Sequence, residues 1–152
     1  MKYHIRDEHE RETAMADLRA AALPSRMELH QGEEPLTARQ RRTVYLWYTE
    51  AAAQWPGMDA RDVRRHCKLT IGIPLLNRVS ETHAYAYNHG VKRTLTYEQK
   101  LTLMDCWPVL GSEYMTKAGA VEYLDGVWNF CVKDRGWRLT DPSAPGVMRE
   151  ES

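Results

Sequence analysis

The sequence predicts an α+β fold, with residues 1–140 forming a single compact domain, because the chain of 152 residues has the length of one domain. Within residues 1–35, two short runs that alternate apolar and polar residues flank a helical pattern, which is typical of a small β-α-β unit. In residues 36–140, apolar side chains recur mostly at helical spacing and indicate a mainly helical body. Residues 141–152 carry prolines, a glycine and closing acids, which predict a flexible tail.

The N-terminal unit is expected to contain a strand at residues 2–5, a helix over residues 7–23 and a second strand at residues 26–30. Asp7 suits the N-cap position, and acids in the first turn favour the helix dipole. Pro24 ends the helix. If the two strands pair in parallel, their connection should be right-handed.

The first helices of the body begin at capping motifs. Thr37 and Gln40 fit a capping box that starts a helix over residues 38–54. The stripe of that helix predicted to be buried is Val44, Trp47, Tyr48 and Ala51. Asp59 is expected to cap the next helix, which should end near Thr70.

The middle of the body is expected to be less regular. Gly72 should stop the second helix, and residues 71–76 suggest a buried loop or an edge strand because of Pro74. Tyr85 and Tyr87 alternate with alanines, which favours a strand.

Two further helices follow in the sequence. Thr96 starts a helix that should end near Cys106, again through a capping-box pattern. Thr116 is the expected N-cap of a long helix over residues 117–135. Gly136 then has the position of a C-terminal glycine.

Charge is distributed unevenly although the net charge is zero. Residues 1–35 hold 5 Lys/Arg and 8 Asp/Glu, residues 36–100 hold 11 and 5, and residues 101–152 hold 5 and 8. The net charges of these segments are therefore −3, +6 and −3. Such a pattern arises either from clustering on solvated faces or from one basic surface, and a basic surface indicates an anionic partner.

Four cations in residues 59–70 share one helix face, because they recur at i, i+3, i+4 and i+7. They are Arg61, Arg64, Arg65 and Lys68. Like charges at these separations repel, and an anionic partner would relieve the repulsion. Three more arginines, Arg39, Arg41 and Arg42, lie near a helix N-terminus, where the dipole disfavours cations and favours bound anions.

A second group of candidate nucleic-acid contacts flanks Tyr85 and Tyr87. It consists of Arg78, Lys92 and Arg93. Interleaved rings and cations suit single-stranded nucleic acid, since bases stack on rings while cations follow the phosphates. The alternative is that Tyr85 and Tyr87 belong to the core.

The sequence offers no positive sign of an enzyme or of a cofactor. His83, Asn88 and His89 share residue types with a metal-dependent nuclease, yet the flanking hallmarks of such a site are missing. The odd number of cysteines, without a C-x-x-C motif, predicts buried reduced thiols. The charged N-terminus lacks the apolar region of a secretory signal, so a cytoplasmic location is expected.

The order of these elements resembles the NinB/Orf family of phage recombination proteins over roughly residues 3–142. The residues that carry the resemblance are Gln40 with Trp47, the segment 66–76, and the closing pattern Gly136-x-x-Leu139-x-x-Pro142. Arg41 stands where the family has an asparagine after Gln40. The resemblance implies a small α+β homodimer with a basic cleft, which binds single-stranded DNA, contacts the host single-strand-binding protein and helps to load a recombinase.

The leading hypothesis is therefore a non-enzymatic recombination mediator of phage type, located in the host cytoplasm, that binds single-stranded DNA through its basic residues. One alternative is a phage-type adaptor or inhibitor whose arginines bind an acidic protein surface. A metal-dependent nuclease that uses His83 and His89 is a further alternative.

Overall fold

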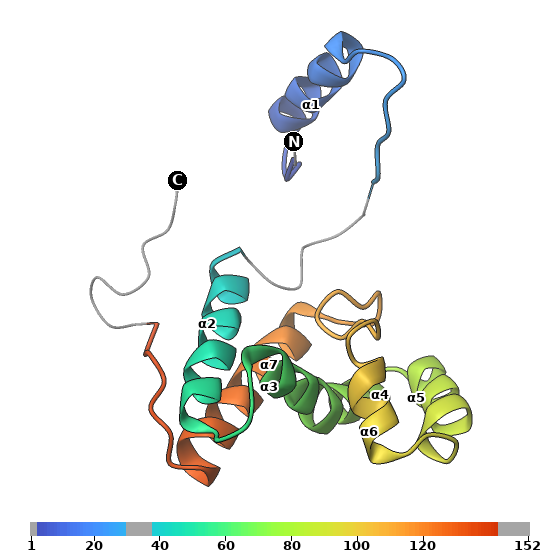
Figure 1. The fold of residues 1–152 in the computed structure, drawn as a ribbon. Helices are drawn as coiled ribbons and strands as arrows, with labels where there is room; N and C mark the ends of the chain where they lie inside the picture. Colours follow the sequence, from blue (N-terminus) through green and yellow to red (C-terminus); the bar gives the residue numbers. More distant parts are fainter. Residues whose placement is uncertain (1–2, 30–37, 143–152) are drawn as a thin grey trace. The chain divides into compact units, whose positions relative to one another are not determined.

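The structure is a computed structural model that describes residues 3–29 and 38–142. The chain divides into an N-terminal unit, Met1–Gly32, and a body, Glu33–Ser152. Every regular element within the described ranges is a helix, and none of those residues forms a strand (Figure 1). The predicted α+β fold with a β-α-β unit is therefore wrong.

The N-terminal unit contains one helix, α1 (Glu8–Ala20), which Asp7 caps by accepting a hydrogen bond from the Glu10 backbone N–H. The parts of the two predicted strands that are described, residues 3–5 and 26–29, have no regular structure. Short alternating runs become strands only when a neighbouring strand supplies backbone hydrogen bonds, and these two runs do not pair. The helix was predicted correctly, although it ends at Ala20 rather than at residue 23.

The body begins with α2 (Ala38–Gln54), and this helix confirms the predicted bounds. Its buried side chains include the whole predicted stripe: Val44, Trp47, Tyr48 and Ala51. The predicted capping residue, Thr37, lies outside the described residues.

A long, interrupted helix follows, made of α3 (Ala60–Cys67), the π-helical segment η1 (Lys68–Gly72) and α4 (Ile73–Val79). The Asp59 cap predicted for its start is confirmed, and it forms a capping box with Asp62. The predicted stop at Gly72 and the loop or edge strand at residues 71–76 are wrong, because the helix continues through both. Pro74 lies in the first turn of α4, directly after the π-helical segment.

The next helix consists of α5 (Glu81–Tyr87) and a second π-helical segment, η2 (Asn88–Lys92). The strand predicted from Tyr85 and Tyr87 is wrong. The buried residues His83, Tyr87 and Val91 recur every four residues, which is helical spacing, and Tyr85 lies on the exposed side. Alternation over only two tyrosines did not distinguish a strand from a helix.

The body ends with α6 (Tyr97–Leu103), α7 (Lys117–Trp128) and the π-helical segment η3 (Asn129–Asp134). The capping box at the start of α6 and the Thr116 cap of α7 are confirmed. The end predicted for α6 was three residues too late. Gly136 has a φ of 71°, as expected for a glycine that ends a helix.

An extended strap, residues 137–142, lies along α2 and is held there by side chains of that helix. The Gln54 amide group pairs with both the N–H and the C=O of Arg138, at 2.9 and 2.8 Å. The Glu50 carboxylate accepts hydrogen bonds from the backbone N–H and hydroxyl of Thr140, and the Trp47 indole donates to the Thr140 carbonyl at 2.9 Å. These contacts satisfy backbone groups of a segment that has no secondary structure of its own.

The core gathers around a close crossing of the interrupted helix with α7. A Cβ atom added at Gly126 of α7 would lie 2.7 Å from Cγ2 of Ile71 in the interrupted helix, and one at Gly72 would lie 2.6 Å from Cγ1 of Val109, in the segment between α6 and α7. Tyr123 of α7 is fully buried beside this crossing. The predicted buried thiols are confirmed for Cys67 and Cys131, whereas Cys106 is exposed; all three are free (residues 67, 106 and 131).

Among residues 3–29 and 38–142, no helix combines the length and the apolar character that crossing a bilayer requires.

Gly72→Ala should lower the free energy of unfolding by about 1–3 kcal/mol, because the added methyl group overpacks a buried contact. Urea denaturation measures the change. The matched control is Gly90→Ala in η2, where a Cβ meets nothing within 4 Å and should leave stability unchanged or slightly raised. Equal stabilities for the two variants would contradict the close contact between Gly72 and Val109.

Candidate nucleic-acid interface

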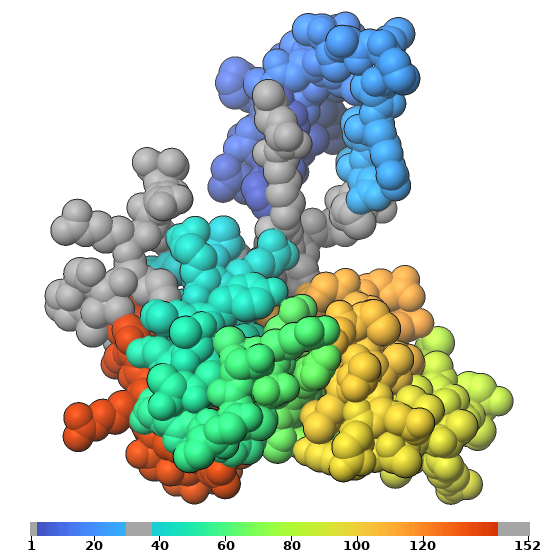
Figure 2. All heavy atoms as spheres, viewed as in Figure 1, coloured from blue at the N-terminus to red at the C-terminus, as the bar shows by residue number. Residues whose placement is uncertain are grey.

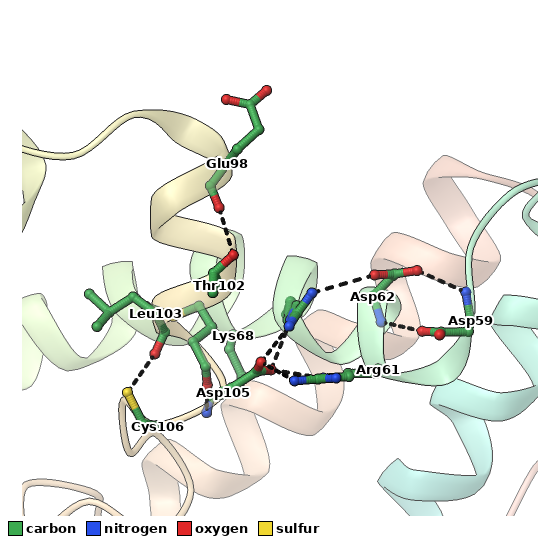
Figure 3. Close-up of polar contacts among 11 residues, drawn as sticks. Asp59, Arg61, Asp62, Lys68, Glu98, Thr102, Leu103, Asp105 and Cys106 are labelled. Atoms are coloured by element: carbon green, nitrogen blue, oxygen red, sulfur yellow. Dashed lines mark hydrogen bonds and ion pairs between the residues drawn. The ribbon is translucent and has the colours of Figure 1, made fainter.

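The basic face predicted on residues 61–68 is present, but most of its charge meets groups of the same chain. Arg61 and Arg65 both reach the carboxylate of Asp105, just beyond the end of α6 (Figure 3). The Arg61 Nη2 to Asp105 Oδ2 distance is 2.6 Å, and the Arg65 Nε to Asp105 Oδ1 distance is 2.8 Å. Arg65 also pairs with Asp62 on its own helix at 3.8 Å. The guanidinium groups of Arg65 and Arg61 hold the pKa of Asp105 well below its usual range.

Lys68 is buried at the same place, and its Nζ donates a hydrogen bond to the backbone carbonyl of Met104. Met104 is the C-cap of α6, so the ammonium group meets the negative end of a helix. Burial, and secondarily the charge of Arg64, lower the pKa of Lys68 to about 8. Three of the four cations on this face therefore hold the end of α6, and the anionic group that relieves their repulsion is intramolecular.

Arg64 is the exception, because it points toward α2 rather than α6. Its guanidinium carbon lies 5.7 Å from the centroid of the Tyr45 ring, within the range of a cation–π contact. Tyr45 is 52% exposed, and its ring meets the buried Tyr48 ring edge-on at 6.0 Å. α2 and α3 pack side by side, so their outer residues share one surface of the body (Figure 2).

The arginines at the start of α2 have different environments. Arg39 donates to the backbone carbonyl of Pro142 at 3.1 Å, which ties it to the strap. Arg42 is exposed and Arg41 is half-buried, and neither has an ion pair within the described ranges. Both lie one helical turn before Tyr45. Arg41, Arg42, Tyr45 and Arg64 together are called the arginine patch below.

The second group of predicted contacts is also divided. Arg78 pairs with Glu122 of α7. Lys92 lies in η2 and Arg93 directly follows it; both are exposed. Tyr87 is buried, as the alternative interpretation expected, whereas Tyr85 is 68% exposed.

His83, one of the two histidines of the nuclease hypothesis, has a hydrogen-bond partner at each ring nitrogen. The Trp107 indole donates to His83 Nε2 at 3.0 Å, so Nδ1 carries the proton and donates to Asn77 Oδ1 at 2.8 Å. Burial lowers the pKa of His83, which keeps the ring neutral. The other histidine, His89, donates a hydrogen bond from Nδ1 to the Tyr85 carbonyl at 2.9 Å. Across the part of the chain that is described, no three His, Cys, Asp or Glu side chains gather where they could share a metal ion.

Two residues central to this surface were missed by the sequence analysis. Tyr45 was detectable, because it lies outside the buried stripe of α2 and follows Arg41 and Arg42 by one turn. Asp105 was not detectable, since it lies forty residues from Arg65 and only the fold brings them together.

No protein-family model, curated protein or solved structure matches this chain.

Asp105→Asn should lower the free energy of unfolding at neutral pH. It should also make the further decrease of that free energy in acid smaller than in the wild-type protein. The depressed pKa of Asp105 stabilises the fold above the usual carboxyl value of about 4, and this contribution disappears as the pH falls below that value. Thermal unfolding across the acidic range measures both effects. Asp125→Asn, at an exposed acid of α7, is the control and should change neither the stability at neutral pH nor its decrease in acid. If Asp105→Asn changes these two quantities as little as Asp125→Asn does, the pairing of Asp105 with Arg61 and Arg65 does not stabilise the fold.

Proposed function

We propose that this protein is a non-enzymatic nucleic-acid-binding protein that takes single-stranded DNA on the arginine patch. The observation that carries the proposal is the arrangement of three arginines without acidic partners, within the described residues, around an exposed ring. Guanidinium groups bind phosphates, and an open tyrosine face stacks an unpaired base. Both features together favour a single strand over a duplex, whose bases are already stacked.

The zero net charge of the chain is compatible with this proposal because the patch is local. Binding through a small number of phosphate contacts weakens as the salt concentration rises. On a single strand, each contact steepens the slope of log binding constant against log salt concentration by about 0.7. The exposed ring adds a contribution that does not depend on charge. An acidic protein surface would use both the arginines and the ring, since Tyr and Arg are enriched at protein interfaces, and the binding experiment below separates the two kinds of partner.

The more specific role, recombinase loading with a host single-strand-binding protein and a homodimeric state, rests on the sequence resemblance to NinB/Orf alone. The α+β fold that the resemblance implied is not the fold of the described residues. The phage recombination role is therefore a separate proposal, which the arginine patch does not test.

Arg41→Glu combined with Arg42→Glu should weaken binding of a labelled single-stranded oligonucleotide by at least about tenfold, because two phosphate contacts are lost and two repulsions are added. The slope of log affinity against log salt should also fall by about 0.7 for each lost contact. Fluorescence anisotropy at several salt concentrations measures both quantities.

The matched control is Lys133→Glu combined with Arg138→Glu, which changes the net charge equally at exposed positions. Arg138 lies beside the opposite end of α2, next to Gln54. Equal losses in the two double variants would show binding to general charge rather than to the patch. Absence of binding to any oligonucleotide at low salt would reject the proposal in favour of a protein partner.

A further inference from the structure

A pair of stacked rings stands on the exposed side of α5 and η2. The centroids of Tyr85 and His89 are 4.1 Å apart, and their planes are inclined by only 28°. His89 Nδ1 donates to the Tyr85 backbone carbonyl at 2.9 Å, which fixes the orientation of the imidazole. The two rings therefore form a pre-organised stack, in which each ring covers one face of the other.

This pair contributes nothing to the core of the body. The core side of the same helix is formed by His83, Tyr87 and Val91, all of which are buried. Tyr85 is 68% exposed and His89 is also exposed. A large apolar ring that packing does not require, held flat and open to solvent, is suited to stacking with a ligand.

Three cations surround the C-terminal end of η2, one turn beyond the ring pair. Lys92 and Arg93 are exposed there, and Lys100 of α6 donates its Nζ to the Lys92 carbonyl at 2.8 Å. No ion pair joins any of these three to a carboxylate among the residues the structure describes. Rings followed by uncompensated cations reproduce the arrangement that binds bases and phosphates of a single strand.

We propose that the Tyr85–His89 pair is a second contact for single-stranded nucleic acid, at which an unpaired base stacks on the rings while Lys92, Arg93 and Lys100 meet phosphates. This inference rests on the proposed function, and it adds a site that shares no residue with the arginine patch. The segment that carries it, α5 with η2, belongs to the same body as α2 and α3 (Figure 1), so one protein molecule presents both contacts.

The chemistry of this site predicts dependence on bases rather than on phosphates alone. Base–aromatic stacking contributes about 1–3 kcal/mol per base when measured by alanine substitution, and it tolerates any base because each has a π face. An oligonucleotide of abasic sugars has the same phosphates but nothing to stack. Because Tyr45 of the arginine patch also stacks a base, the contribution of the ring pair is the part of the preference for bases over abasic sugars that is lost in Tyr85→Ala.

The experiment measures anisotropy of a labelled oligothymidylate and of an abasic oligonucleotide of equal length, with wild-type protein, Tyr85→Ala and Tyr85→Phe. Wild-type protein should prefer the oligothymidylate. Tyr85→Ala should bind oligothymidylate about fivefold or more weakly, with little change toward the abasic strand. Tyr85→Phe keeps the ring and should retain wild-type affinity. Unfolding curves should coincide, since Tyr85 is exposed.

The outcomes separate this inference from the function on which it rests. If wild-type protein binds oligothymidylate and Tyr85→Ala binds it equally well, the second contact is overturned while the arginine patch stands. Equal wild-type affinity for both oligonucleotides also overturns stacking at this pair. If neither oligonucleotide binds, the proposed function fails and this inference fails with it.

Discussion

Close packing at Gly72 and Gly126 is the constraint on which the rest of the body depends. Neither residue has a side chain, so Ile71 of the interrupted helix packs directly on Gly126 of α7, and Val109, from the segment between α6 and α7, packs directly on Gly72. Any Cβ at these positions would lie within 3 Å of a neighbouring side chain. The glycine that interrupts the helical pattern in the sequence is thus a packing residue, and the tertiary contact decides the course of the backbone.

The same close packing fixes the surface that we propose to bind nucleic acid. Tyr123 of α7 is buried beside Gly72, and its hydroxyl group lies 2.6 Å from that of Tyr48 in α2. Burial raises the pKa of both phenols, so the two remain neutral and share one hydrogen bond. Tyr48 in turn supports the ring of Tyr45. A ring held by the core loses little freedom when a ligand stacks on it, which favours binding.

Local interactions were predictable from the sequence, and long-range ones were not. The caps at Asp59, Thr96 and Thr116 were read correctly because each depends on residues within one helical turn. The strands were wrong because alternation over a few residues says nothing about whether a partner strand exists. The break assigned to Gly72 was wrong because glycine both ends helices and permits close packing, and only the neighbouring helix distinguishes the two.

The cation face of α3 shows why a charge pattern alone does not identify a binding site. Spacing on a helix places arginines together, and their mutual repulsion requires an anionic neighbour, but it does not say whether that neighbour is a ligand or a residue of the same chain. Here Asp105 and the end of α6 supply it for Arg61 and Arg65. Reversing those two charges would therefore weaken the fold, and a loss of binding in such variants would report on stability. Arg64, Arg41 and Arg42 make no such pair within the described chain, so substitutions at these three positions report on binding itself.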